Sequence, residues 1–187
     1  KEDANRASSL EAMSTLAEHI KSITPSKVKI TVRAGQGEAG KASAFLSLVK
    51  DASVPMPEVT LHRANGRASY RASASTVTWW DAMDLVHELG HAFEHKSAAI
   101  GEAARAYLAK RTAGEVSRAL RALLPTKGYK PDEVSKPDRF FDPYVGKQYA
   151  HGATEILSMA LEAWYRGHLE AWFADRELLL FALGCMK

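Results

Sequence analysis

The hydrophobic positions of the chain follow a helical period first, then an alternating period, and then a helical period again. Apolar side chains recur every three or four positions from Leu10 to Ile20, which predicts an amphipathic helix over residues 3–21. Residues 27–32 alternate polar and apolar side chains, which is typical of a half-buried strand. After a glycine-rich turn, residues 42–50 are expected to form a short helix.

The middle of the chain carries strand signals. Asn65-Gly66 stands between segments 59–62 and 68–72, and this pair of residues is typical of the turn in a β-hairpin. Residues 73–80 include Thr76-Val77-Thr78-Trp79, which is rich in strand formers and predicts a third strand. This strand is either one more member of the sheet, or an edge that pairs with an extended substrate.

Helical patterns dominate the second half of the chain. Asp81 is placed to cap a helix that is expected to continue to about His95. A long helical region follows over residues 97–124, with a break near Gly114 and an end at Pro125.

The last third alternates between irregular and helical segments. Residues 125–151 contain four prolines, and so long an irregular stretch in a compact domain is usually functional or mobile. Two further helices are expected over residues 154–165 and 175–183. The patterns together predict a single α+β domain over residues 1–187, with a small mixed sheet packed on a central helix and a mostly helical C-terminal half.

Composition excludes several classes of protein. With 187 residues, of which 46% are hydrophobic and 25% charged, the chain has the composition of an ordinary soluble globular protein. No apolar run reaches the roughly 18 residues of a membrane span. The single cysteine, Cys185, excludes an internal disulfide framework and is compatible with the cytoplasm, although the compartment stays unknown.

Charge and chain ends add two expectations. The net charge of +3 is too small to indicate nucleic acid, although basic strips over residues 61–80 and 102–130 leave such binding as a hypothesis, to be tested by its salt dependence. No secretory signal is visible and the first residue is Lys1 rather than methionine, so we expect the chain to be a fragment of a longer protein. The oligomeric state has no signal in the sequence.

The main chemical motif is His87-Glu88-Leu89-Gly90-His91, which has the pattern HExxH. On a helix, His87 and His91 lie on one face, where both imidazoles can bind one zinc ion. Glu88 points in a different direction and can take a proton from a water molecule that the metal activates. The pattern therefore predicts a metal-dependent hydrolase.

A catalytic zinc usually has three protein ligands, so a third residue is required. The longer pattern HExxHxxGxxH needs a histidine at position 97, but this residue is Ser97. Glu94 or His95 as the third ligand would place all three ligands along one straight helix, where they cannot surround a metal ion well. Glu155, at the start of a helix 64 positions after the second histidine, is the preferred third ligand. Glu162, two turns further along the same face, is either the ligand instead or a partner that orients a ligand histidine.

These motifs carry a resemblance to a known group of enzymes. HELGH followed by a helix with Glu155-Ile156-Leu157-Ser158 resembles the gluzincin group of zinc metallopeptidases, which implies a zincin-like fold and Glu155 as the ligand that completes the site. The layout from Tyr149 to Trp164 is similar to lethal-factor-like peptidases, in which a tyrosine precedes the ligand glutamate. A further resemblance, over residues 142–149, the Glu155 helix and the ending 181–184, is to a C-terminal HExxH module of prophage head-associated proteins and bacterial toxins. This resemblance implies that the chain is the C-terminal part of a longer protein.

Tyr149 is the candidate for stabilising negative charge on the former carbonyl oxygen, because a phenol beside the metal can donate a hydrogen bond to it. Tyr144, His151 and His168 are the alternatives for this role.

The predicted function is a zinc-dependent endopeptidase that hydrolyses a protein or peptide substrate, in a toxin or effector domain. The alternative is a zinc-stabilised structural or interaction module of a phage-type assembly that cleaves nothing. Glu88 favours the enzyme, since a structural metal site does not need that carboxylate, and Glu88→Gln separates the two hypotheses.

Overall fold

The computed structural model describes residues 37–63 and 66–187, and these residues form an α+β structure, as predicted. The helix expected over residues 3–21 and the strand over 27–32 lie outside the described residues. The α-helices are α2 (Glu38–Val49), α3 (Ala82–Lys96), α4 (Ala98–Arg111), α5 (Leu120–Leu123), α6 (Ile156–Arg166), α7 (Leu169–Ala174) and α8 (Arg176–Cys185). The strands are β1 (Thr60–Arg63), β2 (Ser69–Arg71), β3 (Thr76–Trp79), β4 (Arg118–Ala119) and β5 (Val134–Ser135), and the 3₁₀ helices are η1 (Ala72–Ala74), η2 (Pro125–Lys127) and η3 (Pro143–Gly146).

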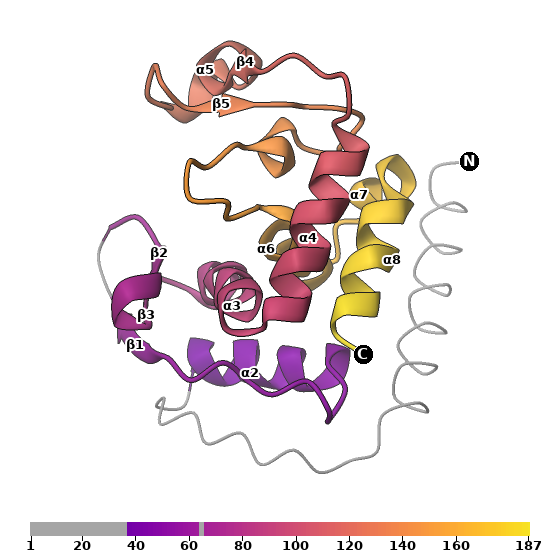
Figure 1. Cartoon of the computed structure of the whole chain (residues 1–187). Helices are drawn as coiled ribbons and strands as arrows, with labels where there is room; N and C mark the ends of the chain where they lie inside the picture. The colour runs from indigo at the N-terminus through magenta and orange to yellow at the C-terminus, as the bar shows by residue number, and fades with distance from the viewer. Residues whose placement is uncertain (1–36, 64–65) are drawn as a thin grey trace, which may run out of the picture.

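The elements are arranged around α3, which Figure 1 shows almost end-on near the centre of the molecule. In that view α2 crosses below α3, the strands β1–β3 lie on one side, and α4 and α8 lie on the other. Contacts of α3 with α2, α4, α6, β2 and β3 place the HExxH helix in the middle of the core. The small sheet therefore packs on this helix, as the sequence predicted.

The three-stranded sheet has the order β1-β3-β2, with β1 parallel and β2 antiparallel to β3. The predicted hairpin is wrong, because the segments on either side of Asn65-Gly66 form β1 and β2 but β3 lies between them. Val77 and Trp79 of β3 are buried, whereas most side chains of β1 and β2 are exposed. The more apolar strand therefore occupies the central position, where neighbours cover both of its edges.

The prediction that residues 73–80 form a strand is confirmed for Thr76–Trp79 only, since Ala72–Ala74 form the 3₁₀ turn η1. Ser75 completes that turn in the left-handed region, with φ 47°. Because β1 and β2 hydrogen-bond to β3 from both sides, β3 offers no free edge, and the hypothesis that it pairs with a substrate is wrong.

Helix α3 begins after Asp81 and ends at Lys96, close to the boundaries that the sequence predicts. The Asp81 side chain accepts a hydrogen bond from the Asp84 amide at 2.9 Å, which confirms the predicted cap. Ser97 ends α3 and also caps α4, where its hydroxyl accepts a hydrogen bond from the Ile100 amide at 3.4 Å. These caps fix α3 and α4 as two separate helices joined at a single residue.

The break expected near Gly114 is present, and Gly114 adopts the left-handed conformation with φ 80°. The helical region predicted to continue from there to residue 124 is wrong for most of its length, because only Leu120–Leu123 form a helix, α5. Arg118–Ala119 form β4, which pairs antiparallel with β5 inside the stretch that was expected to be irregular. These elements lie at the top of Figure 1, beyond the end of α4.

Arg111, in the last turn of α4, hydrogen-bonds to the loop at Asp138 and to the start of α8 at Asp175. Its Nε donates to Asp138 Oδ2 at 2.7 Å, and its two terminal nitrogens donate to the two oxygens of Asp175 at 3.0 and 3.2 Å. Asp175 also caps α8 through the Leu178 amide at 3.1 Å. Two parallel bonds to one carboxylate set both distance and orientation, so Arg111 fixes the start of α8 against α4.

The helices predicted near the C-terminus are confirmed as α6 and α8, but α7 was not predicted. With only six residues, Leu169–Ala174, α7 is too short to show a helical period of apolar positions. Within residues 37–63 and 66–187, none of the helices combines the length and the apolar character that crossing a membrane requires.

Candidate metal centre

His87 and His91 lie one turn apart on the face of α3 that packs against α6. Their ring centroids are 5.1 Å apart with an interplanar angle of 75°, and each side chain is only 14% exposed. The structure therefore brings both predicted ligand histidines together, with their Nε2 atoms directed toward the start of α6.

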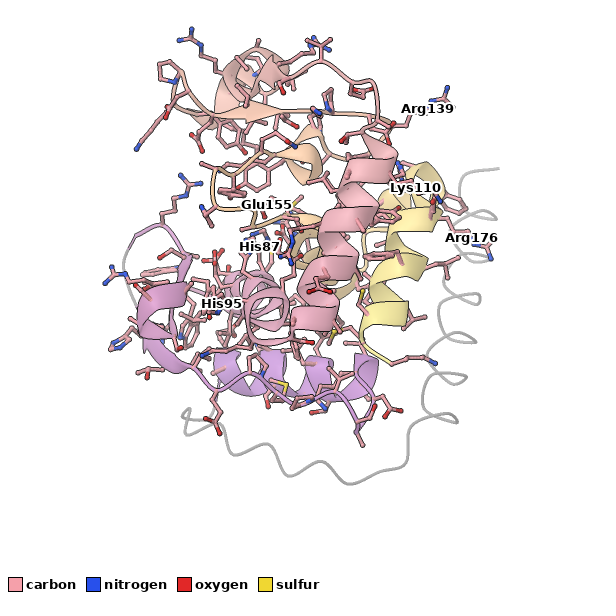
Figure 2. The ribbon with its side chains drawn as sticks, viewed as in Figure 1. His87, His95, Lys110, Arg139, Glu155 and Arg176 are labelled. Atoms are coloured by element: carbon pink, nitrogen blue, oxygen red, sulfur yellow. The ribbon has the colours of Figure 1, made fainter. Side chains whose placement is uncertain are left out.

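Glu155 precedes α6 and is fully buried between these two histidines. Its Oε2 lies 3.3 Å from His87 Nε2 and 3.2 Å from His91 Nε2. The three ligand atoms all lie within 4.8 Å of one another, which is the spacing of a group that can hold one metal ion. Figure 2 shows His87 and Glu155 next to each other near the centre of the molecule.

Close contact between α3 and α6 makes this convergence possible. Gly90 lies against the backbone of Ser158, so that a Cβ atom on Gly90 would be only 2.5 Å from Ser158 Cα. Ser158 in turn donates its hydroxyl hydrogen to Glu155 Oε2 at 2.8 Å. The absence of a side chain at Gly90 therefore lets the two helices approach closely enough for Glu155 to reach the histidines.

Glu162 lies on the other side of the His87 ring. Its Oε2 accepts a hydrogen bond from His87 Nδ1 at 2.8 Å, and its Oε1 forms an ion pair with the Arg166 guanidinium at 2.8 Å. With Nδ1 engaged by Glu162, His87 directs Nε2 toward Glu155. Of the two predicted roles for Glu162, this geometry supports orienting a histidine rather than holding the metal.

Glu88 is buried, with 6% of its surface exposed, and does not belong to the converging ligand atoms. Burial raises the pKa of its carboxyl group, while the charges of His91 and His87 and a backbone hydrogen bond from Tyr70 oppose the rise. A glutamate whose pKa moves toward neutrality is suited to accept and return a proton.

The histidines and carboxylates of the site shift each other's pKa values. Burial lowers the pKa of His87, but the carboxylates of Glu155 and Glu162 outweigh burial and raise it to about 10. Burial raises the pKa of Glu155, but the neighbouring charges of His91 and His87 dominate and hold it well below its usual range. The cluster therefore holds Glu155 as a carboxylate, the form in which it could bind a metal ion.

Tyr149 donates its hydroxyl hydrogen to Glu155 Oε1, so the predicted tyrosine does lie beside the candidate metal ligands. Burial and the Glu155 carboxylate raise the pKa of Tyr149, which keeps its phenol protonated. The Lys147 Nζ atom lies 4.7 Å from the centroid of the Tyr149 ring and 4.9 Å from that of the Tyr144 ring. It also donates to Glu133 at 2.7 Å.

Sequence reasoning missed Lys147, a buried lysine held between two tyrosine rings. Its position two residues before Tyr149 was the available signal, since alternate residues of an extended segment lie on the same side.

The remaining candidates are not part of the group that can hold a metal. His95 Nδ1 pairs with the Tyr70 hydroxyl at 2.9 Å, and Glu94 accepts hydrogen bonds at the start of α6. His151 and His168 are both exposed, although the His151 ring lies 5.4 Å from that of Tyr149. Tyr144 accepts a hydrogen bond from Lys147 Nζ at 3.3 Å.

Comparison of the chain with family models, curated proteins and solved structures finds no significant match in any of the three.

Proposed function

We propose that the chain is a zinc-dependent endopeptidase with a zincin-like fold, in which His87, His91 and Glu155 hold zinc. The observation that carries this proposal is the convergence of two imidazole nitrogens and one carboxylate oxygen within 4.8 Å. A structural zinc is usually surrounded by four protein ligands, whereas three ligands leave the fourth position for water or substrate. The donor set therefore favours catalysis over a purely structural role.

The carboxylate of Glu88 supports a hydrolytic reaction. Zinc at this centre would supply Lewis acidity, which polarises a peptide carbonyl and makes a water molecule more acidic. Glu88 would accept the proton of the attacking water and pass it to the departing amine, a cycle that the raised pKa of its buried carboxyl group favours.

Two further side chains would assist the reaction. The Tyr149 phenol, whose single hydrogen is donated to Glu155 Oε1 in the structure, would turn to donate it to the carbonyl oxygen as negative charge develops there. This is favourable because burial keeps the phenol protonated. Glu162 would hold the His87 ring in one tautomer and one orientation through its bond to Nδ1.

Metal content is the first test. The wild-type protein, purified without added metal, should contain about one zinc per chain, and Glu155→Ala should contain much less. Glu102→Ala, at an exposed carboxylate on α4, is the matched control and should retain the metal. A folded wild-type protein that takes up no zinc even when zinc is added would overturn the proposal.

Cleavage of an unfolded protein substrate is the second test. Wild type should cleave it, and Glu88→Gln should retain zinc and fold but lose cleavage. If the wild type binds zinc and cleaves no protein or peptide, the non-catalytic structural or interaction module becomes the better assignment.

A further inference from the structure

The start of α6 has an unusual distribution of hydrogen bonds. Glu155 occupies the N-cap position, where a side chain commonly accepts a hydrogen bond from a backbone amide of the first turn. The Glu155 side chain makes no such bond. Its carboxylate instead contacts His87, His91, Tyr149 and Ser158. The residue that would complete the metal centre is therefore not available to cap its own helix.

Glu94 of α3 supplies the missing acceptor. Its Oε1 accepts a hydrogen bond from the Leu157 amide at 3.0 Å, which is the second amide of α6. The Thr154 hydroxyl lies 2.8 Å from both Glu94 oxygens and also accepts a hydrogen bond from the Ile156 amide at 3.2 Å. Glu94 thus holds the residues on both sides of Glu155.

Helix geometry explains why Glu94 can do this. It lies three residues after His91 and seven after His87, so all three side chains project from the same face of α3. Gly90 lies between them at the closest approach to Ser158. One face of α3 therefore contacts α6 both through the candidate metal ligands and through the cap. A carboxylate at this place is also favoured by the positive end of the α6 dipole.

We infer that Glu94 is a positioning residue of the metal centre, which caps α6 in place of Glu155 and thereby fixes the Glu155 carboxylate against His87 and His91. This inference rests on the proposed metal site. Helix α3 would then provide two of the metal ligands, His87 and His91. A further polar residue of this helix, Glu94, would hold the remaining ligand, Glu155, in position.

The test compares zinc affinity in Glu94→Ala, Glu94→Gln and the control Glu102→Ala with wild type, by competition with a chromophoric chelator. Partners that orient metal ligands typically contribute roughly 10–100-fold to affinity, so Glu94→Ala should bind zinc more weakly by that factor. Glu94→Gln keeps an oxygen acceptor for the Leu157 amide and should recover most of the affinity. Glu102→Ala should match wild type.

Cobalt(II) absorption separates positioning from simple stabilisation, since the visible bands report the geometry of the ligands. Glu94→Ala should alter these bands, and Glu94→Gln should restore them. A Glu94→Ala protein that is less stable but keeps wild-type zinc affinity and cobalt bands would overturn the inference.

Thr154→Val provides a second route if Glu94→Ala does not fold. Valine has nearly the volume of threonine but lacks the hydroxyl that bridges Glu94 and the Ile156 amide. It should weaken zinc binding, while Thr154→Ser should not, and equal affinity in both variants would count against the inference. A wild type that binds neither zinc nor cobalt would instead overturn the metal centre itself, and with it this role of Glu94.

Discussion

Replacing Gly90 by alanine tests how closely α3 and α6 must approach. The added Cβ would lie 2.5 Å from Ser158 Cα and 2.8 Å from Ser158 N. Carbon atoms in ordinary contact are roughly 3.5–4.0 Å apart, so the two helices would have to separate by about 1 Å. Ser158 hydrogen-bonds to Glu155, and the separation would therefore draw the Glu155 carboxylate away from both histidines.

The expected cost has two parts. Forcing an extra carbon into a packed core usually destabilises a protein by about 1–3 kcal/mol. Zinc affinity should also fall, by roughly tenfold or more, because the ligand oxygen no longer meets the histidine nitrogens at the right distance. Urea unfolding of the metal-free protein measures the first effect, and chelator competition measures the second.

Gly184→Ala is the matched control, since Gly184 also lies in a helix but has open space around its Cβ position. Alanine favours helix over glycine by about 1 kcal/mol, so this variant should be slightly more stable than wild type, with unchanged zinc affinity. If Gly90→Ala is as stable as wild type and binds zinc equally well, the close contact does not set the position of Glu155.

Three further predictions concern the neighbours of the metal centre. Glu162→Gln should weaken zinc binding roughly 10–100-fold without abolishing it, because His87 Nδ1 loses its anionic partner, and an affinity equal to wild type in chelator competition would contradict this. Tyr149→Phe should retain zinc but lower kcat by about 10²–10³-fold, whereas an unchanged kcat on an unfolded protein substrate would exclude the phenol from catalysis. In the metal-free protein, the raised pKa of His87 makes a stabilising contribution that is complete below its ordinary pKa of 6.5 and is lost as the pH rises through about 10. The free energy of unfolding in chelator should decline over that range, and a flat profile would refute this reasoning.

The local part of the candidate site could be predicted from the sequence because helix geometry fixes it. Positions 87 and 91 share a face of any helix, and position 88 points elsewhere, whatever the rest of the fold. Choosing between Glu155 and Glu162 required the structure, since the sequence places both on one side of the same predicted helix. Only the packing against α3 decides which carboxylate meets Nε2 of His87 and which meets Nδ1.

The strand order could not be predicted from local signals. Asn65-Gly66 correctly marks a place between two strands, but a turn signal cannot reveal that a third strand, β3, inserts between them. The burial of Val77 and Trp79, which sets the central position, depends on contacts with α3 that only the tertiary structure shows.

Glu94 illustrates a different limit. The sequence raised it as a ligand and set it aside on geometric grounds, which the structure supports, because it is not among the converging ligand atoms. Its contacts with Thr154 and Leu157 could not be predicted, since nothing in the sequence shows that the Glu155 side chain makes no capping hydrogen bond to α6.

The two halves of the candidate metal centre come from segments that are far apart in the chain, and this separation sets the order in which a ribosome produces them. A nascent chain that stops before residue 155 already carries both histidines and Glu88, but not the carboxylate that joins them. At about 5–20 residues per second, the 64 positions between His91 and Glu155 correspond to roughly 3–13 s of synthesis. The candidate centre is therefore completed only once residue 155 has been made, and translation products that stop before it lack the centre.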